Sequence, residues 1–122
     1  MREIKFRAWD LDNKKYEYDI TIRPNNRLIG IEIFNNEMYP VEFRGTVEQY
    51  TGLKDKNGKE IYEGDILQID DHVLGDFKVV WHNLGWGIKR SVGYETLAVH
   101  KSENCTVIGN IHDNPELLEE EK

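Results

Sequence analysis

Residues 49–67 read Gln-Tyr-Thr-Gly-Leu-Lys-Asp-Lys-Asn-Gly-Lys-Glu-Ile-Tyr-Glu-Gly-Asp-Ile-Leu, and this stretch decides the fold class. Its polar centre contains Asn57-Gly58, the dipeptide that best tolerates positive φ at both central positions of a tight turn. A second reversal at Glu63-Gly64-Asp65 leads into the apolar run 66–69. The stretch therefore predicts two chain reversals and one fixed strand register. It identifies no reaction.

The N-terminal part of the chain has the two-residue periodicity of β-strands. Apolar and polar side chains alternate over residues 4–9 and again over 16–20, with turn-forming residues at 10–14 between them. Such a pattern predicts a hairpin with one buried face. The chain is therefore expected to open with two antiparallel strands.

A second hairpin is predicted at residues 28–43. Asn35-Asn36 tolerates the left-handed backbone of a reversal, so residues 28–34 should pair with 38–43. Pro40 cannot donate to a strand ladder, which makes the return strand an edge or a short strand. The first of these strands places three branched side chains on one face, Ile29, Ile31 and Ile33.

The second half of the sequence continues the β pattern. Short apolar strands separated by Gly, Asn and Asp are expected at residues 65–69, 77–82, 86–89, 95–99 and 106–111. Their order and glycine content resemble a small SH3-like β-barrel. Residues 114–121 combine a capping Asn, a Pro at the first helical position and early acids, so we expect a short C-terminal helix. The predicted fold class is mainly β.

Composition favours one globular domain, residues 1–122, with possible lobes at 1–63 and 64–122. The net charge is −7, and residues 1–63 carry 11 basic against 12 acidic residues, whereas 64–122 carry 5 against 11. Phosphate binding by nucleic-acid-binding proteins draws on Lys and Arg, so this acidic chain is a poor general nucleic-acid binder. Cys105 is the single cysteine, which fits a reducing cytoplasm. No run approaches the ~20 apolar residues that span a bilayer.

Three blocks in order, residues 2–10, 49–65 and 107–118, resemble the YopX family of phage and prophage proteins. The resemblance extends from end to end of the chain and is weakest over 66–100. It implies a small β-rich protein encoded by a bacteriophage or prophage, oligomeric in some form. It implies no activity, because the family has no assigned catalytic residues. Contacts specific to this protein are expected in the loops 70–76 and 82–94.

Acidic residues form the densest set of potential metal ligands: Asp65, Asp70, Asp71, His72 and Asp76. Oxygen ligands suit Mg²⁺ or Ca²⁺, but the set lacks the spacing of a calcium loop, so solvated loop residues are the simpler interpretation. We therefore predict no metal and no cofactor, and we keep Asp70, Asp71 and His72 only as binding candidates.

Aromatic side chains supply the other binding candidates, Trp81, Trp86 and Tyr94. Small barrels can present such rings to bases or peptides, although aromatic residues are also common strand and core residues. Cys105 precedes an apolar strand, which indicates a buried, inert thiol. No nucleophile elbow, phosphate loop or zinc signature occurs in the sequence. We therefore expect that this protein is not an enzyme.

The leading functional hypothesis is a non-enzymatic phage accessory protein that acts through protein–protein contacts, with possible homo-oligomerisation through unpaired strand edges. The first alternative is a nucleic-acid-binding module that uses Lys14, Lys15 and Arg23. The second is a metal-assisted hydrolase that uses the acidic loop. These three classes differ in what the protein should bind: a protein, a salt-sensitive nucleic acid or a divalent ion.

Overall fold

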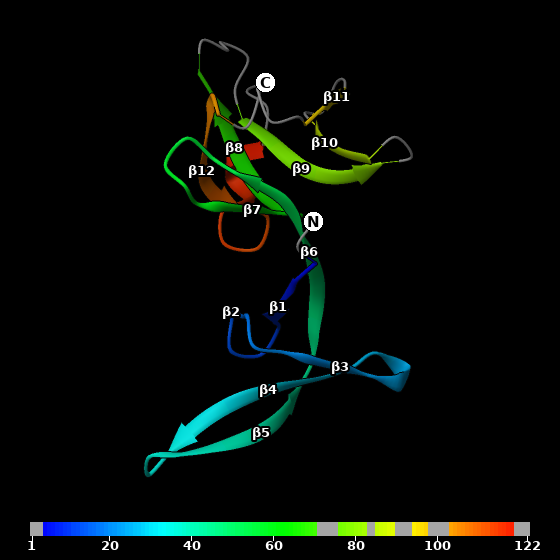
Figure 1. Ribbon diagram of the computed structural model, residues 1–122, viewed down its shortest axis with the longest axis vertical. Coiled ribbons are helices and arrows are strands. Elements are labelled where there is room, and N and C mark those ends of the chain that lie inside the picture. The colour runs from blue at the N-terminus through cyan, green and yellow to red at the C-terminus, as the bar shows by residue number, and fades with distance from the viewer. Residues whose placement is uncertain (1–3, 71–75, 83–84, 90–93, 98–102, 119–122) are drawn as a thin grey trace. The chain divides into compact units, whose positions relative to one another are not determined.

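The computed structural model describes residues 4–70, 76–82, 85–89, 94–97 and 103–118. The prediction of a mainly β protein is confirmed, since all strand pairs there are antiparallel and the helices are single 3₁₀ turns (Figure 1). The elements in chain order are β1 (Phe6–Asp10), β2 (Lys15–Glu17), β3 (Thr21–Arg23), η1 (Pro24–Asn26), β4 (Arg27–Phe34), β5 (Glu37–Phe43), β6 (Gly45–Lys54), β7 (Glu60–Tyr62), β8 (Asp65–Ile69), β9 (Asp76–His82), β10 (Gly85–Lys89), β11 (Tyr94–Thr96), β12 (Cys105–Asn110) and η2 (Pro115–Leu118).

The chain forms two compact units. Residues 5–49 make the hairpin unit, and residues 1–4 with 50–122 make the sheet unit. The division therefore falls within β6, between Gln49 and Tyr50. The charge change near residue 63, which suggested a lobe boundary, lies inside the sheet unit.

In the hairpin unit both predicted hairpins are confirmed. Strand β1 lies between β2 and β6, and β4 lies between β3 and β5. The first hairpin turns at Asp10, whose carboxylate accepts hydrogen bonds from the backbone N–H groups of Asp12 and Asn13, each at 3.0 Å. The second turns at Asn35 and Asn36, with φ of 51° and 62°. Among the described strands β5 pairs with β4 alone, as Pro40 requires of an edge strand.

The sheet unit is built on the strand order β11-β10-β9-β8-β12. Its apolar core consists of Ile61, Leu67, Ile69, Phe77, Val79, Trp86, Ile88, Leu97 and Cys105. The SH3-like barrel is not confirmed, because among the described strands β11 and β12 each pair with one neighbour and not with each other. The described strands form antiparallel sheets without that closure.

The expected C-terminal helix is not confirmed either. Among the described residues the segment makes only the 3₁₀ turn η2, with the Leu117 N–H donating to the Asn114 carbonyl at 3.1 Å. The Asn114 amide oxygen instead accepts from the Asn110 backbone at 3.3 Å, and its side chain packs on Gly109. A side chain that accepts from the residue four positions before it is not available to cap the N–H groups that follow it. A helix this short also has little propagation to offset the unfavourable nucleation step.

Asp55 holds the sheet unit together at the distinctive stretch of the sequence. Its Oδ1 accepts from the backbone of Asn57 and Lys59 at 2.8 and 3.0 Å, and its Oδ2 accepts from Val107 on β12 at 2.9 Å. One buried carboxylate thus closes a turn and joins it to a strand 52 residues later. Only Gly58 of the Asn-Gly pair takes positive φ, at 83°, so the turn is organised from Asp55 rather than by two left-handed residues.

Burial would by itself raise the pKa of the Asp55 carboxyl, but the hydrogen bonds from Val107, Lys59 and Asn57 outweigh it, and the pKa lies below the ordinary value. A carboxylate with a lowered pKa stabilises the fold above its unfolded-state pKa, and this stabilisation is lost as the pH falls through the folded-state pKa.

We predict that Asp55→Asn lowers the free energy of unfolding by about 1–3 kcal/mol at pH 7, because an amide leaves one N–H facing another donor. Urea unfolding at pH 7 and pH 3 measures the effect. The loss of stability on acidification should be smaller in this variant than in the parent chain. Asp19→Asn, which removes an exposed carboxylate, is the charge-matched control and should follow the parent at both pH values. Equal acid sensitivity of parent and Asp55→Asn would contradict this role.

Candidate functional site

The β4–β5 hairpin exposes apolar side chains that a soluble protein normally buries. We call residues 29–42 the arm; its two strands run side by side to the Asn35-Asn36 turn (Figure 1). Ile33 is 74% exposed, Met38 68% and Phe34 67%, and Ile31 and Tyr39 are also exposed. An exposed apolar patch bordered by polar residues is characteristic of a surface that contacts another macromolecule.

The strand register places most of these side chains on one face. Ile31 lies opposite Pro40, and Ile33 lies opposite Met38. Since alternate residues of a strand share a face, these four residues and Ile29 form one apolar stripe, which we call the arm face. This is the face on which the sequence placed Ile29, Ile31 and Ile33. The sequence did not indicate that it would be exposed.

An ion pair marks the inner end of the arm face. The guanidinium of Arg27 donates to the carboxylate of Glu42 through Nε at 2.8 Å and through Nη2 at 3.0 Å. This hydrogen bonding lowers the pKa of Glu42 and raises the pKa of Arg27. Both side chains are about half exposed, so the pair adds little stability and serves chiefly as a charged border of the apolar stripe.

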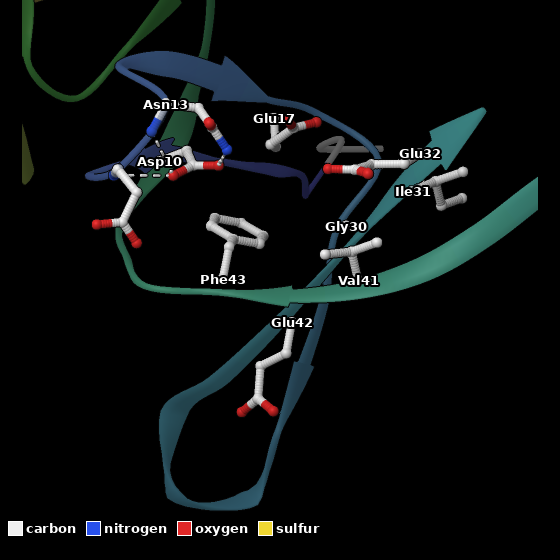
Figure 2. Close-up of a pocket in the computed structure, with 10 residues that line it drawn as sticks. Asp10, Asn13, Glu17, Gly30, Ile31, Glu32, Val41, Glu42 and Phe43 are labelled. Atoms are coloured by element: carbon white, nitrogen blue, oxygen red, sulfur yellow. Dashed lines mark hydrogen bonds between the residues drawn. The ribbon is translucent and has the colours of Figure 1, made fainter. Parts of the chain in front are cut away.

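A small acidic hollow lies beside the arm within the hairpin unit. Its volume is about 90 Å³, and it is lined by Asp10, Asp12, Asn13, Glu17, Gly30, Ile31, Glu32, Val41, Glu42 and Phe43. Figure 2 shows Val41 and Phe43 pointing into it, whereas Glu42 between them points away. The hollow therefore combines an apolar floor with a rim of carboxylates.

The rim carboxylates are largely engaged within the protein. Asp10 holds the first hairpin turn, Asp12 accepts from Arg44 at 2.6 Å, and Lys15 lies 3.3 Å from Glu17. In the described part of the chain no group of three His, Cys, Asp or Glu side chains is arranged to hold a metal ion. The carboxylates of the hollow would therefore attract a positively charged group, but the described residues do not form a metal-coordination site.

The basic residues of the first half are interleaved with acidic residues along the sequence. Arg7 is 4% exposed, and its Nη2 and Nε both lie 2.9 Å from Oε1 of Glu48. The Arg7 guanidinium also stacks on the Tyr16 ring, 3.8 Å from its centroid, and the Tyr16 hydroxyl donates to Glu48 at 2.9 Å. Burial in this network withdraws Arg7 from any phosphate contact. Nucleic-acid binding through Lys14, Lys15 and Arg23 stays an untested prediction.

The two candidate tryptophans lie opposite each other in the sheet unit, one on β9 and one on β10. Trp81 is 57% exposed, whereas Trp86 is 8% exposed, and their rings make an edge-to-face contact at 4.8 Å. Trp86 belongs to the core, and its indole N–H has no hydrogen-bond partner among the described residues. Of the pair, only Trp81 therefore offers its ring to a ligand.

The acidic loop candidates are mostly beyond the described residues. Asp70 follows β8 and accepts hydrogen bonds from the Lys56 ammonium at 3.0 and 3.1 Å. Asp71, His72 and the side chain of Tyr94 lie outside the described residues. Specific contacts were also expected in the loops 70–76 and 82–94. Of these, residues 71–75, 83–84 and 90–93 lie outside the described residues, whereas Gly85–Lys89 form strand β10, so the expectation stays a prediction.

Cys105 is fully buried, as predicted. Burial, followed by the charges of Asp55 and Asp70, raises the pKa of its thiol to about 11. A thiol with so high a pKa stays protonated and is a poor nucleophile. In the described residues no helix is long and apolar enough to cross a lipid bilayer.

Phe43 lies at the base of both the arm and the hollow. The two glycines next to it, Gly30 and Gly45, differ in whether a Cβ atom would fit at their positions. A Cβ on Gly45 would lie 2.5 Å from the Trp9 carbonyl oxygen and 2.9 Å from Phe43. A Cβ on Gly30 would lie 3.4 Å from Phe43, an ordinary contact.

We predict that Gly45→Ala lowers the free energy of unfolding by about 1–3 kcal/mol, because the backbone of β1 must move. Gly30→Ala is the matched control and should change stability by less than about 0.5 kcal/mol. Chemical denaturation of both variants is the measurement. If the two variants had similar free energies of unfolding, the close approach of Gly45 to Trp9 would not restrict the side chain at position 45.

One family model and two solved structures are similar to this chain. The family model described as "YopX protein" matches residues 5–119. The crystal structure of protein EF1440 from Enterococcus faecalis is similar, with a TM-score of 0.67 and 28% identity over 98% of this chain and 100% of that chain. The crystal structure of protein YopX from Bacillus subtilis is similar in fold, with a TM-score of 0.65 and 20% identity over the whole of both chains. No protein with a curated description matches the sequence. The chain belongs to the YopX family.

Proposed function

We propose that this protein is a non-enzymatic accessory protein of a phage or prophage, working in the bacterial cytoplasm, and that it acts by binding another protein through the arm face. The phage context rests on the resemblance to the YopX family. The mode of action rests on one observation, the arm face, on which Ile31, Ile33, Met38 and Pro40 are exposed and Ile29 is partly buried.

The energetics of this stripe favour a protein partner. Covering an exposed Ile or Met side chain contributes about 1.5–3 kcal/mol to association. The stripe itself carries no charged group, so it offers nothing to phosphates and little to a polar small molecule. An apolar strand face instead suits another protein surface, where aliphatic side chains interdigitate.

The arm also has the form of a binding element. It is a two-stranded ribbon held by a continuous register from Leu28↔Phe43 to Phe34↔Glu37. A ribbon of this kind presents its side chains in a fixed arrangement, so little conformational entropy is lost on binding. Left uncovered, the same apolar β-ribbon favours aggregation, which gives a reason for it to have a partner.

We predict that Ile33→Glu combined with Met38→Glu weakens binding of the partner at least tenfold, since two charges would have to be desolvated at the contact. The immobilised chain is used to capture binding proteins from host lysate, and the amount retained is quantified against the parent. Leu11→Glu is the control, because Leu11 is 49% exposed in the first hairpin turn and lies off the arm. Retention of the same proteins by parent and double variant would refute the arm as the binding surface. Turnover in an unbiased substrate screen would refute the non-enzymatic function.

A further inference from the structure

We propose that the sheet unit carries a second binding site, built on Trp81 and Trp86, for an extended, proline-containing and basic segment of another protein. The site is separate from the arm and goes beyond the function proposed for it. Trp81 contributes the exposed face of its ring, and Trp86 contributes a buried indole N–H that has no partner among the described residues. A ligand for this pair therefore needs an apolar ring and a hydrogen-bond acceptor next to it.

Trp81 lies on the core face of β9 and is nevertheless exposed. Alternate residues of a strand share a face, so Trp81 is on the same side as Phe77 and Val79, which are both buried. The pairing of β8 with β9 runs from Gln68↔Asp76 to Ile66↔Lys78, whereas the pairing of β10 with β9 continues as far as His82 (Figure 1). The β9–β10 hairpin therefore extends the apolar face of the sheet beyond its buried part, and the indole of Trp81 stands at that end.

Trp86 places an unpaired hydrogen-bond donor next to this exposed ring. A buried tryptophan N–H normally has an acceptor, because leaving the donor unpaired costs its desolvation energy. The rings of Trp86 and Trp81 make an edge-to-face contact, with their centroids 4.8 Å apart. Since Trp81 is the exposed member of the pair, rotation of its side chain is the movement that would admit an acceptor to the N–H without disturbing the core.

An extended segment that contains proline meets both requirements. Its pyrrolidine ring can stack on the face of the Trp81 indole. The carbonyl groups of a polyproline II segment make no hydrogen bonds within the segment, so one of them is available to accept from Trp86. Grooves lined by aromatic side chains recognise such segments, and little conformational entropy is lost because the segment is already extended before it binds.

Charge disfavours single-stranded nucleic acid, the other common ligand of exposed aromatic rings. Bases stack on such rings, but the affinity for the strand also draws on Lys and Arg at its phosphates. Residues 64–122 carry 5 basic against 11 acidic residues. This half of the chain therefore repels phosphates and attracts a basic segment, which is why the proposed ligand carries lysine or arginine beside its prolines.

The first test is an array of peptides of about 12 residues that contain Pro-x-x-Pro and lysine, each printed beside the same peptide with alanine for proline. The parent chain should retain the proline peptides and not their alanine counterparts. The dissociation constant of the best peptide is then measured by fluorescence anisotropy. Trp81→Ala should weaken binding about tenfold or more, because an exposed tryptophan at a contact is a typical hot spot. Trp81→Phe keeps an aromatic face and should weaken it less than about threefold.

Matched controls separate this site from the arm. Tyr39→Ala also removes an exposed aromatic ring, but from the hairpin unit. Ile33→Glu combined with Met38→Glu alters the arm face. Both variants should bind the peptide with the affinity of the parent, and circular dichroism verifies the β fold of every variant.

The hydrogen bond to Trp86 is tested in the parent chain, so no core variant is needed. In ¹H–¹⁵N NMR spectra, assigned through the backbone resonances, the indole N–H signal of Trp86 should move downfield as the peptide is added. Trp9 is buried in the hairpin unit, and its indole signal is the internal reference that should stay in place.

Each other result overturns the proposal in a different way. Unchanged affinity of Trp81→Ala shows that the peptide binds elsewhere, and equal retention of the alanine peptides shows that proline is not recognised. A Trp86 signal that does not move at saturation removes its N–H from the contact. If the array retains no peptide, the proposal is wrong; binding of a single-stranded oligodeoxythymidine that is lost in Trp81→Ala would then assign the site to nucleic acid. The function proposed for the arm stands or falls separately, with the arm variants.

Discussion

Three backbone N–H groups from two separate parts of the chain donate to the carboxylate of Asp55, and the sheet unit depends on this convergence. The Lys56 N–H adds a bond to the Cys105 carbonyl at 3.0 Å, so the turn after β6 is fixed to the start of β12 at two points. Asp65 acts similarly one reversal later, where its Oδ2 accepts from the Tyr62 N–H at 2.8 Å. These carboxylates are structural acceptors. Their buried oxygens accept backbone N–H groups and so hold the turns in place.

The sequence was sufficient to predict the elements whose cause is local. Alternation identified the strands, and the Asn35-Asn36 pair located the second reversal, because only local backbone preference is needed there. It was insufficient where local signals compete or where tertiary contacts decide. The Asn114 side chain contacts Asn110 and Gly109, which precede it, and the described part of this segment forms the 3₁₀ turn η2 in place of the expected helix. Glycine-rich strands in series suggested a closed barrel, but closure depends on which end strands meet, and no local pattern specifies that.

The sequence predicted which residues of the candidate site share a face, but not that this face is exposed. A period-two pattern assigns Ile29, Ile31 and Ile33 to one face, and the ordinary expectation is that an apolar face is buried. Whether another element covers that face is a property of the fold, not of the strand. The signal that could have found the arm was the combination of a long hairpin, a proline in its return strand and apolar residues continuing up to the turn. The two tryptophans show the same limit, because the sequence did not indicate that Trp86 lies in the core and Trp81 on the surface.

The two units therefore distribute their apolar residues differently. In the sheet unit, branched and aromatic side chains converge on one core, with Ile61, Leu67 and Ile88 completely buried. In the hairpin unit the buried positions are few and include the ion pair of Arg7 with Glu48, while five large apolar side chains of the arm remain exposed. A buried ion pair contributes less to stability than apolar packing, because desolvation of the charges offsets much of their attraction. The apolar surface that would have strengthened the core of this unit is instead displayed on a preorganised ribbon. Such an arrangement is hard to explain by stability of the isolated chain and is readily explained if covering the arm by another protein completes the hydrophobic burial.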